Sequence, residues 1–266
     1  MCLVALAWKS HPRWRLLLAG NRDEFHARPT SALGRWPGER AILAGRDLQS
    51  GGTWAGMDEN GRCAVVTNVR DPLAGADAAM SRGALPVDFL AGALDADAHG
   101  RRLLSGSTQY APYNLLLVDA DSCEYVGNTP VEHRAIAPGI HGMSNGGFDS
   151  DWPKTRRLCT AMETWSHTDA TDPAAMWNAL ADERIAADSE LPNTGVGLEL
   201  ERMLSAAFIR GPRYGTRAST LIAIDYEGRG WISERRFGPD GVFEGETTLR
   251  STLPPDPTKP ANNGNA

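Results

Sequence analysis

Residues Cys2–Trp8 read CLVALAW and residues Trp14–Ala19 read WRLLLA, with the polar segment KSHPR between them. Short apolar runs on either side of a polar turn are typical of paired β-strands. This stretch therefore predicts a β-hairpin that begins with the first residues of the chain. It places Cys2 at the start of the first strand, so the rest of the fold has to be built around that strand.

The segments that follow predict groups of strands separated by helices. A second hairpin is expected at Thr53–Met57 and Arg62–Val69, because the Asn60-Gly61 dipeptide in its turn is a strong hairpin signal. Further strands are expected at Asn114–Asp119, Glu124–Gly127, His133–Ile136, Gly139–Met143, Ser219–Asp225, Gly230–Phe237 and Val242–Leu249. Helices are expected at Ser81–Leu94, from Asp151 onward, at Pro173–Asp182 and at Leu198–Ala207.

This order of elements favours an α+β fold, with two stacked sheets or a sheet pair flanked by helices. The hydrophobic fraction of 41% is ordinary for a globular protein and is enough for a full core. We expect residues 1–250 to form a single domain. Residues 251–266 are rich in proline and asparagine, which predicts a disordered C-terminal tail.

Composition also excludes several classes of partner. The net charge is −6 and the basic residues are scattered, which argues against nucleic acid and anionic membranes. No apolar run approaches the roughly 18 residues that a membrane-spanning helix needs, so no membrane insertion is expected. The N-terminus also lacks the pattern of a signal peptide, and we expect a cytoplasmic protein.

The metal-binding residue types are not grouped as metal sites require. The four cysteines are far apart in the sequence, and none of the six histidines forms an H-x-x-x-H pair. We therefore expect neither a metal site nor a disulfide framework. The cysteines are Cys2, Cys63, Cys123 and Cys159.

Cys2 is the sharpest candidate for chemistry. If Met1 is removed, as is usual before a small second residue, Cys2 supplies both a thiol nucleophile and an α-amino group. That amine has a pKa of roughly 7.7–8.0, which suits a general base near neutral pH. The alternative is that Cys2 merely follows Met1 at the start of a buried strand.

A dense polar run, GNRDEFH, follows the second strand. Alternation along an extended chain places Asn21 and Asp23 on one face, and Arg22 and Glu24 on the other. If the hairpin pairs in register, Asp23 approaches the terminal amine. His26 is the one histidine in this motif. The alternative is a polar turn held by an internal ion pair between arginine and carboxylate.

Three further polar residues lie at the ends of expected strands. Asn68 and Asn145 have side-chain amides, which are suitable donors to an oxyanion because they are neutral and rigid. Arg217 precedes a strand and could bind a substrate carboxylate. Taken alone, each asparagine is more typical of a turn, and Arg217 is more typical of a capped loop.

These motifs together resemble the NRDE family, also called Transport and Golgi organisation 2-like. The likeness spans roughly residues 1–250 in order. Besides Met1-Cys2 and the NRDEF run with Arg28-Pro29, the matching motifs include Gly52-Thr53-Trp54, Ser81-Arg82-Gly83, Ser144-Asn145, Trp152-Pro153-Lys154 and Tyr214-Gly215-Thr216-Arg217.

The family resembles N-terminal-nucleophile (Ntn) hydrolases of the cholylglycine hydrolase and penicillin V acylase type. That likeness implies a four-layer αββα sandwich of two mainly antiparallel sheets, with the first strand central in one sheet. It also implies a cleft in which Cys2 is the nucleophile, Asp23 orients its amine, and Asn68 and Asn145 bind the oxyanion or the amine. Residues expected to contact substrate are Asn21, Arg22, Glu24, His26 and Arg217. Those hydrolases carry an arginine where this chain has Ala19, and Arg22 or Arg217 is the candidate replacement.

Two main functions follow from the resemblance. The first is an amidohydrolase that cleaves a non-peptide C–N bond of an acylated small molecule and requires no cofactor. The second is a non-catalytic carrier that uses the same cleft for a lipophilic ligand, such as haem or an acyl-CoA, because relatives are linked to haem trafficking and lipid metabolism. A haem carrier would need an axial ligand, for which His26 and Cys2 are the candidates. A purely structural or interaction protein is a third reading.

Overall fold

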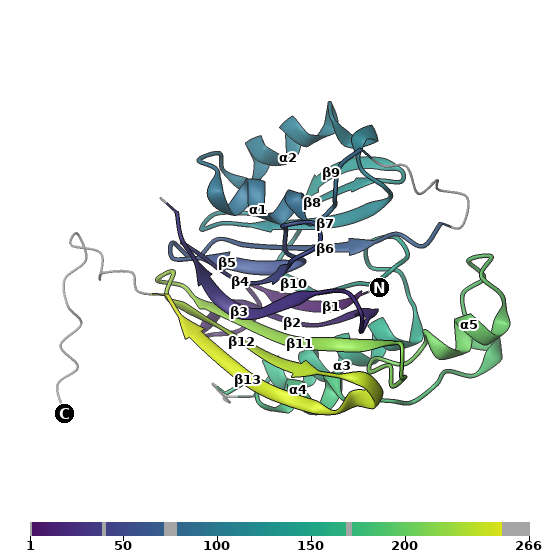
Figure 1. The fold of residues 1–266 in the computed structure, drawn as a ribbon. Helices are drawn as coiled ribbons and strands as arrows, with labels where there is room; N and C mark the ends of the chain where they lie inside the picture. Colours follow the sequence, from purple (N-terminus) through teal and green to yellow (C-terminus); the bar gives the residue numbers. More distant parts are fainter. Residues whose placement is uncertain (1, 39–40, 72–78, 169–171, 252–266) are drawn as a thin grey trace, which may run out of the picture.

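The computed structural model describes residues 2–38, 41–71, 79–168 and 172–251. Within these ranges two antiparallel sheets pack face to face, and helices cover both outer faces (Figure 1). The predicted four-layer αββα sandwich is therefore confirmed. None of the described helices contains a stretch long and apolar enough to cross a lipid bilayer.

The first sheet has six strands in the order β10-β1-β2-β11-β12-β13. Strand β1 pairs with β10 on one side and with β2 on the other. It is thus an interior strand but second from the edge, whereas the prediction placed it at the centre, which β2 and β11 occupy. The strands of this sheet are β1 (Cys2–Trp8), β2 (Trp14–Phe25), β10 (Gly139–Met143), β11 (Tyr214–Asp225), β12 (Gly230–Phe237) and β13 (Phe243–Arg250).

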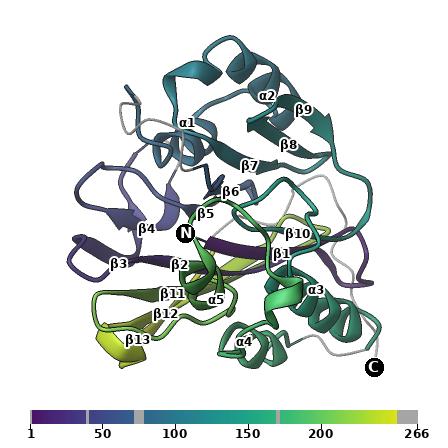
Figure 2. The ribbon, with the colours of Figure 1, turned by 90° about the vertical axis from the view of Figure 1, so that its right-hand side faces the viewer.

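The second sheet has seven strands in sequence order, and both outer faces of the sandwich carry helices (Figure 2). Its strands are β3 (Thr30–Trp36), β4 (Ile42–Asp47), β5 (Ala55–Asp58), β6 (Cys63–Asn68), β7 (Tyr113–Val118), β8 (Cys123–Asn128) and β9 (Val131–Ala135). The helices are α1 (Ala84–Ala91), α2 (Ala96–Leu104), α3 (Pro153–Ser166), α4 (Ala175–Leu180) and α5 (Leu198–Met203).

Three apolar layers hold the sandwich together. Leu6 and Leu116 belong to the layer between the two sheets. Leu3 packs with Leu158 of α3 on one outer face, and Phe89 of α1 belongs to the layer on the other. Because β1 is buried on both faces, its sequence is a continuous apolar run rather than an alternating one.

Strand β2 extends beyond the predicted end at Ala19 and contains the whole NRDEF run. Its polar residues stay in the strand because β1 pairs with one edge and β11 with the other. Cys2 lies opposite Arg22 in the first pairing, and Asp23 lies opposite Thr216 in the second. The run is therefore a strand segment and not a turn.

Several elements differ from expectation. The sequence did not predict strands β3 and β4 or helix α2. Strand β3 contains Ser31 and Gly34, and α2 is rich in charged residues, so neither shows a clear apolar pattern. Helix α1 begins at Ala84 rather than Ser81. The predicted tail lies outside the described residues except for Ser251, whose backbone N–H donates to the Gly230 carbonyl at 2.9 Å.

Candidate active site

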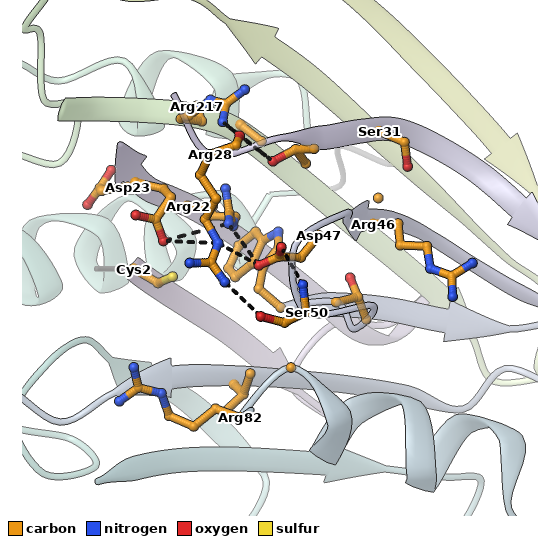
Figure 3. A pocket seen from close by; sticks show the side chains of 18 of the residues that line it. Cys2, Arg22, Asp23, Arg28, Ser31, Arg46, Asp47, Ser50, Arg82 and Arg217 are labelled. Carbon is orange, nitrogen blue, oxygen red and sulfur yellow. Dashed lines mark hydrogen bonds and ion pairs between the residues drawn. The ribbon is translucent and has the colours of Figure 1, made fainter. Parts of the chain in front are cut away.

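A cavity of about 520 Å³ opens beside the start of β1 and is called the Cys2 cavity here (Figure 3). Its walls come from both sheets and from the segment that precedes α1. Three of the four predicted catalytic residues line it, namely Cys2, Asp23 and Asn68. The predicted substrate-binding residues that line it are Arg22, Glu24 and Arg217.

Cys2 is buried, with 7% of its surface exposed, and it borders the cavity. Its backbone carbonyl accepts a hydrogen bond of 3.0 Å from the Ser144 hydroxyl, which fixes the start of β1. Burial raises the pKa of the Cys2 thiol, and the cation of Arg22 on the paired strand acts in the opposite direction. The thiol therefore needs a base or nearby cations to react near neutral pH.

Asp23 follows Arg22 in strand β2, and 1% of its surface is exposed. Its Oδ1 accepts a hydrogen bond of 2.7 Å from the Thr216 hydroxyl, and that hydroxyl accepts the Ile209 backbone N–H at 2.9 Å. Burial raises the pKa of the Asp23 carboxyl, while the positive charge of Lys154 lowers it. The carboxylate is thus held in one orientation at the edge of the cavity.

The two candidate oxyanion residues have different surroundings. The side-chain amide of Asn68 hydrogen bonds to none of the described residues, so it is available to a ligand. Asn145 is 1% exposed and does not line the cavity. Its Nδ2 instead donates to the backbone carbonyl of Asn68 at 2.9 Å. Asn145 therefore lies behind Asn68 and positions it.

An ion-pair network forms one wall of the cavity. Nη2 of Arg22 lies 3.7 Å from both Glu24 and Asp47, and Arg28 Nε lies 2.7 Å from Asp47. Nη1 of Arg22 is buried and has no hydrogen-bond partner among the described residues. Arg22 lies directly opposite Cys2 and can therefore place beside the thiol the cation that Ala19 does not supply.

Asn21 and His26 do not reach the cavity. Asn21 is fully buried, and its Nδ2 donates to the carbonyls of Leu180 and Ala207 at 2.8 and 2.7 Å. The His26 ring nitrogen Nε2 lies 3.1 Å from the Gly211 carbonyl oxygen in a surface turn. Their positions give no support to the expectation that these two residues contact substrate.

Arg217 lines the cavity, and its Nη1 donates to the backbone carbonyl of Arg28 at 2.5 Å. Its Nε is buried without a hydrogen-bond partner among the described residues. Burial lowers the pKa of Arg217 from its usual high value. The side chain is therefore fixed by the backbone while part of its hydrogen-bonding capacity is left over.

Sequence reasoning gave no role to Lys154 or Arg82. Lys154 is 1% exposed, and its Nζ has no hydrogen-bond partner among the described residues. Burial lowers the pKa of Lys154, and the carboxylate of Asp23 raises it. Lysine is almost never fully buried without a partner, so the burial of Lys154 is unusual. In the sequence Lys154 looks like an ordinary residue in the first turn of a helix. Arg82 lines the cavity from the segment before α1.

The described residues include one group whose geometry could suit a metal ion, away from the Cys2 cavity. Ligand atoms of Asp97, Glu124 and His133 lie within 4.8 Å of one another. His133 Nε2 lies 3.1 Å from a carboxylate oxygen of Glu124. None of the described residues that line the Cys2 cavity is a histidine or a tyrosine.

Solved structures with the same architecture include a mutant of the conjugated bile acid hydrolase from Clostridium perfringens. The TM-score is 0.53 at 8% identity, over 94% of this chain and 92% of that chain. A second variant of that enzyme gives a TM-score of 0.56 at 10% identity, with the same coverage. The fold is that of the Ntn hydrolases. The family model for Transport and Golgi organisation 2 matches residues 1–239, and this chain belongs to that family.

Similar relatives are found in distant animals. The Transport and Golgi organization protein 2 homolog of Bos taurus is 29% identical over 93% of this chain and 97% of its own length. The human homolog is also 29% identical, over 95% and 99%. The Drosophila melanogaster protein is 26% identical, over 90% and 94%. Each match therefore spans nearly the full length of both chains.

Proposed function

We propose that this protein is an Ntn-type cysteine amidohydrolase that acts, after removal of Met1, on a non-peptide C–N bond of an acylated small molecule. One observation carries the proposal: Cys2, Asp23 and Asn68 come from distant segments and line the same cavity. If these residues served only in unrelated turns, they would be scattered over the surface instead.

In the first step the thiol sulfur of Cys2 attacks the carbonyl carbon of the amide, and its proton passes to the α-amine of the mature N-terminus. Asp23, held by Thr216, orients that amine. The free amide of Asn68 donates to the oxygen as negative charge develops on it. The proton then moves to the leaving nitrogen, the C–N bond breaks, and an acyl thioester remains on Cys2.

In the second step a water molecule attacks the thioester carbonyl, with the α-amine as the base. The carboxylic acid leaves, the proton returns to the sulfur, and the enzyme is regenerated. The cycle needs no metal and no cofactor, because one residue supplies both nucleophile and base.

The experiment compares wild-type protein with Cys2→Ala and Cys2→Ser on a panel of N-decanoyl amides, with release of amine as the signal. Cys2→Ala should abolish turnover and Cys2→Ser should leave a trace, because a thiol is far more nucleophilic than a hydroxyl near neutral pH. Cys159→Ala is the matched control, since Cys159 is free and lies outside the cavity.

Intact mass spectrometry completes the test. Turnover by a chain that keeps Met1, or full activity in Cys2→Ala, would show that this site does not hydrolyse amides. Cys2→Ala should cost on the order of 1 kcal/mol or less in unfolding free energy, so loss of activity will not be a folding defect.

A carrier for a lipophilic ligand such as haem or an acyl-CoA is the second candidate. The apolar side chains of Trp54, Val66 and Met80 on the cavity wall favour it. Because His26 lies outside the cavity, Cys2 is the remaining candidate axial ligand for haem. Haemin titration of wild-type protein and Cys2→Ala tests this, and a Soret shift that does not depend on Cys2 would exclude ligation by this residue.

A further inference from the structure

The wall of the Cys2 cavity is rich in charge. Six of the described lining residues are arginines and five are aspartates or glutamates. Four of these five carboxylates, those of Asp23, Glu24, Asp47 and Glu234, are already engaged. Asp47 lies within ion-pair distance of Arg22 and Arg28, and Glu234 accepts the Leu33 backbone N–H at 2.9 Å. The hydrogen-bonding groups of the cavity that remain unused are therefore mostly the cationic guanidinium groups of the arginines.

Arg82 is the clearest case. Its Nη1 donates to the backbone carbonyl of Pro112 at 3.0 Å, and it has no carboxylate within ion-pair distance among the described residues. Burial lowers the pKa of Arg82, and the nearby sulfur of Cys2 acts in the opposite direction. A guanidinium stays protonated in such surroundings, so a positive charge faces the cavity close to the thiol.

The position of Arg82 differs from that of the other arginines. It lies on the opposite side of Cys2 from Arg28 and Arg217 (Figure 3). Arg22 adds a buried Nη1 without a hydrogen-bond partner on the strand paired with Cys2. A ligand that reaches the sulfur therefore passes between cationic groups on two walls.

We propose that the Cys2 cavity binds an anionic group, a carboxylate or a phosphate, and that Arg82 holds this group beside the sulfur. A guanidinium pairs with either anion through two parallel hydrogen bonds, which are among the strongest in proteins. A neutral ligand would leave the partly buried cation of Arg82 without a counter-charge among the described residues, which costs free energy. As a statement about substrate class, the inference rests on the amidohydrolase proposal.

The test uses two alkylating reagents of nearly the same size, iodoacetate and iodoacetamide, which differ by one negative charge. Their rate constants at Cys2 are measured by peptide mass spectrometry in the folded protein and in the urea-unfolded chain. We expect the ratio of iodoacetate to iodoacetamide rates to be at least about threefold higher in the folded protein, because a nearby cation attracts the anionic reagent.

Variants assign the effect to one residue. Arg82→Met should return the ratio toward the unfolded value, and Arg82→Lys should keep part of it because it keeps the charge. Arg46→Met is the matched control, since Arg46 is an exposed arginine of the same cavity whose guanidinium stacks on Trp36. The ratio of the two rates cancels any change in the thiolate fraction, and an unchanged urea-unfolding midpoint in Arg82→Met shows that the protein is still folded. A ratio that is unaffected by Arg82→Met overturns the proposal.

Protection by inorganic phosphate or acetate identifies the anion. Slower iodoacetamide labelling in phosphate alone assigns a phosphate ester, and slower labelling in acetate alone assigns a carboxylate. Protection by neither anion contradicts the proposal. Alkylation does not require amide turnover, so a Cys2→Ala variant that retains amidase activity would remove the amidohydrolase proposal and leave this result standing.

Discussion

Gly52 lies in direct backbone contact with Gly83, which lines the Cys2 cavity. A Cβ atom placed on Gly52 would come within 2.3 Å of the Gly83 carbonyl oxygen. The Thr53 backbone N–H donates to that same oxygen at 3.1 Å. Two motifs that are far apart in the sequence, Gly52-Thr53-Trp54 and Ser81-Arg82-Gly83, are thus one structural unit that carries Arg82.

We therefore predict that Gly52→Ala destabilises the protein by about 1–3 kcal/mol, because the added methyl group forces two backbone segments apart. Urea unfolding followed by tryptophan fluorescence measures the loss. Gly34→Ala is the control, since the nearest atom to its added Cβ is 3.8 Å away. Equal stabilities of the two variants would show that the contact is not tight in solution.

A second prediction concerns Asn21, which connects β2 to the helical layer. Besides its two donated bonds, its Oδ1 accepts the Ser219 hydroxyl at 2.6 Å. Asn21→Ala leaves these buried partners without hydrogen bonds, and we expect a loss of about 2–4 kcal/mol in unfolding free energy. The control is Asn60→Ala at an exposed turn, for which we expect a change within about 0.5 kcal/mol. A similar small change at Asn21 would contradict its structural role.

The sequence predicted the part of the fold that depends on local pattern. The apolar runs of β1 and β2 require burial on both faces, so a hairpin in a sandwich was foreseeable. Its register places Cys2 opposite Arg22, which brought the polar run of β2 to the start of β1. The alternation of Asn21 and Asp23 away from Arg22 and Glu24 was foreseeable for the same reason.

The sequence could not show what the side chains on each face of strand β2 contact. Asn21 and Asp23 share a face, yet only Asp23 reaches the cavity, because Leu180 and Ala207 close over Asn21. Those residues are more than 150 positions away along the chain. Arg82 was hidden within a predicted helix that in fact begins at Ala84. Such roles are set by long-range packing and not by local pattern.

Lys154 supplies a third prediction, on the pH dependence of stability. Burial lowers the pKa of its ammonium group in the folded state below the value of 10.5 for an exposed lysine. Between the two values the unfolded chain binds more protons than the folded chain, so the unfolding free energy rises as the pH rises through this window. In Lys154→Met this contribution is absent.

The measurement is the difference in melting temperature between wild-type protein and Lys154→Met from pH 7 to pH 10.5. We expect the melting temperature of wild-type protein to rise relative to that of Lys154→Met as the pH rises. Lys9→Met is the control, because Lys9 is exposed and its Nζ donates to the Asp121 carbonyl at the surface. A difference that stays constant over the whole range would show that the amine of Lys154 is hydrated in solution.

The last prediction concerns the reactivity of Cys2. Burial raises the pKa of its thiol, and Arg22 on the paired strand opposes that shift. Arg22→Gln removes the cation and leaves Glu24 and Asp47 less neutralised, so the thiol pKa should rise further and the thiolate fraction at pH 8 should fall. Since the thiolate is the reacting form, iodoacetamide labelling of Cys2 should slow several-fold at pH 8 and recover at higher pH.

Arg28→Gln removes the same charge from the same network without facing Cys2 across the strand pair, and we expect a smaller effect. Equal pH–rate curves for wild-type protein and Arg22→Gln would show that the thiol is activated without Arg22.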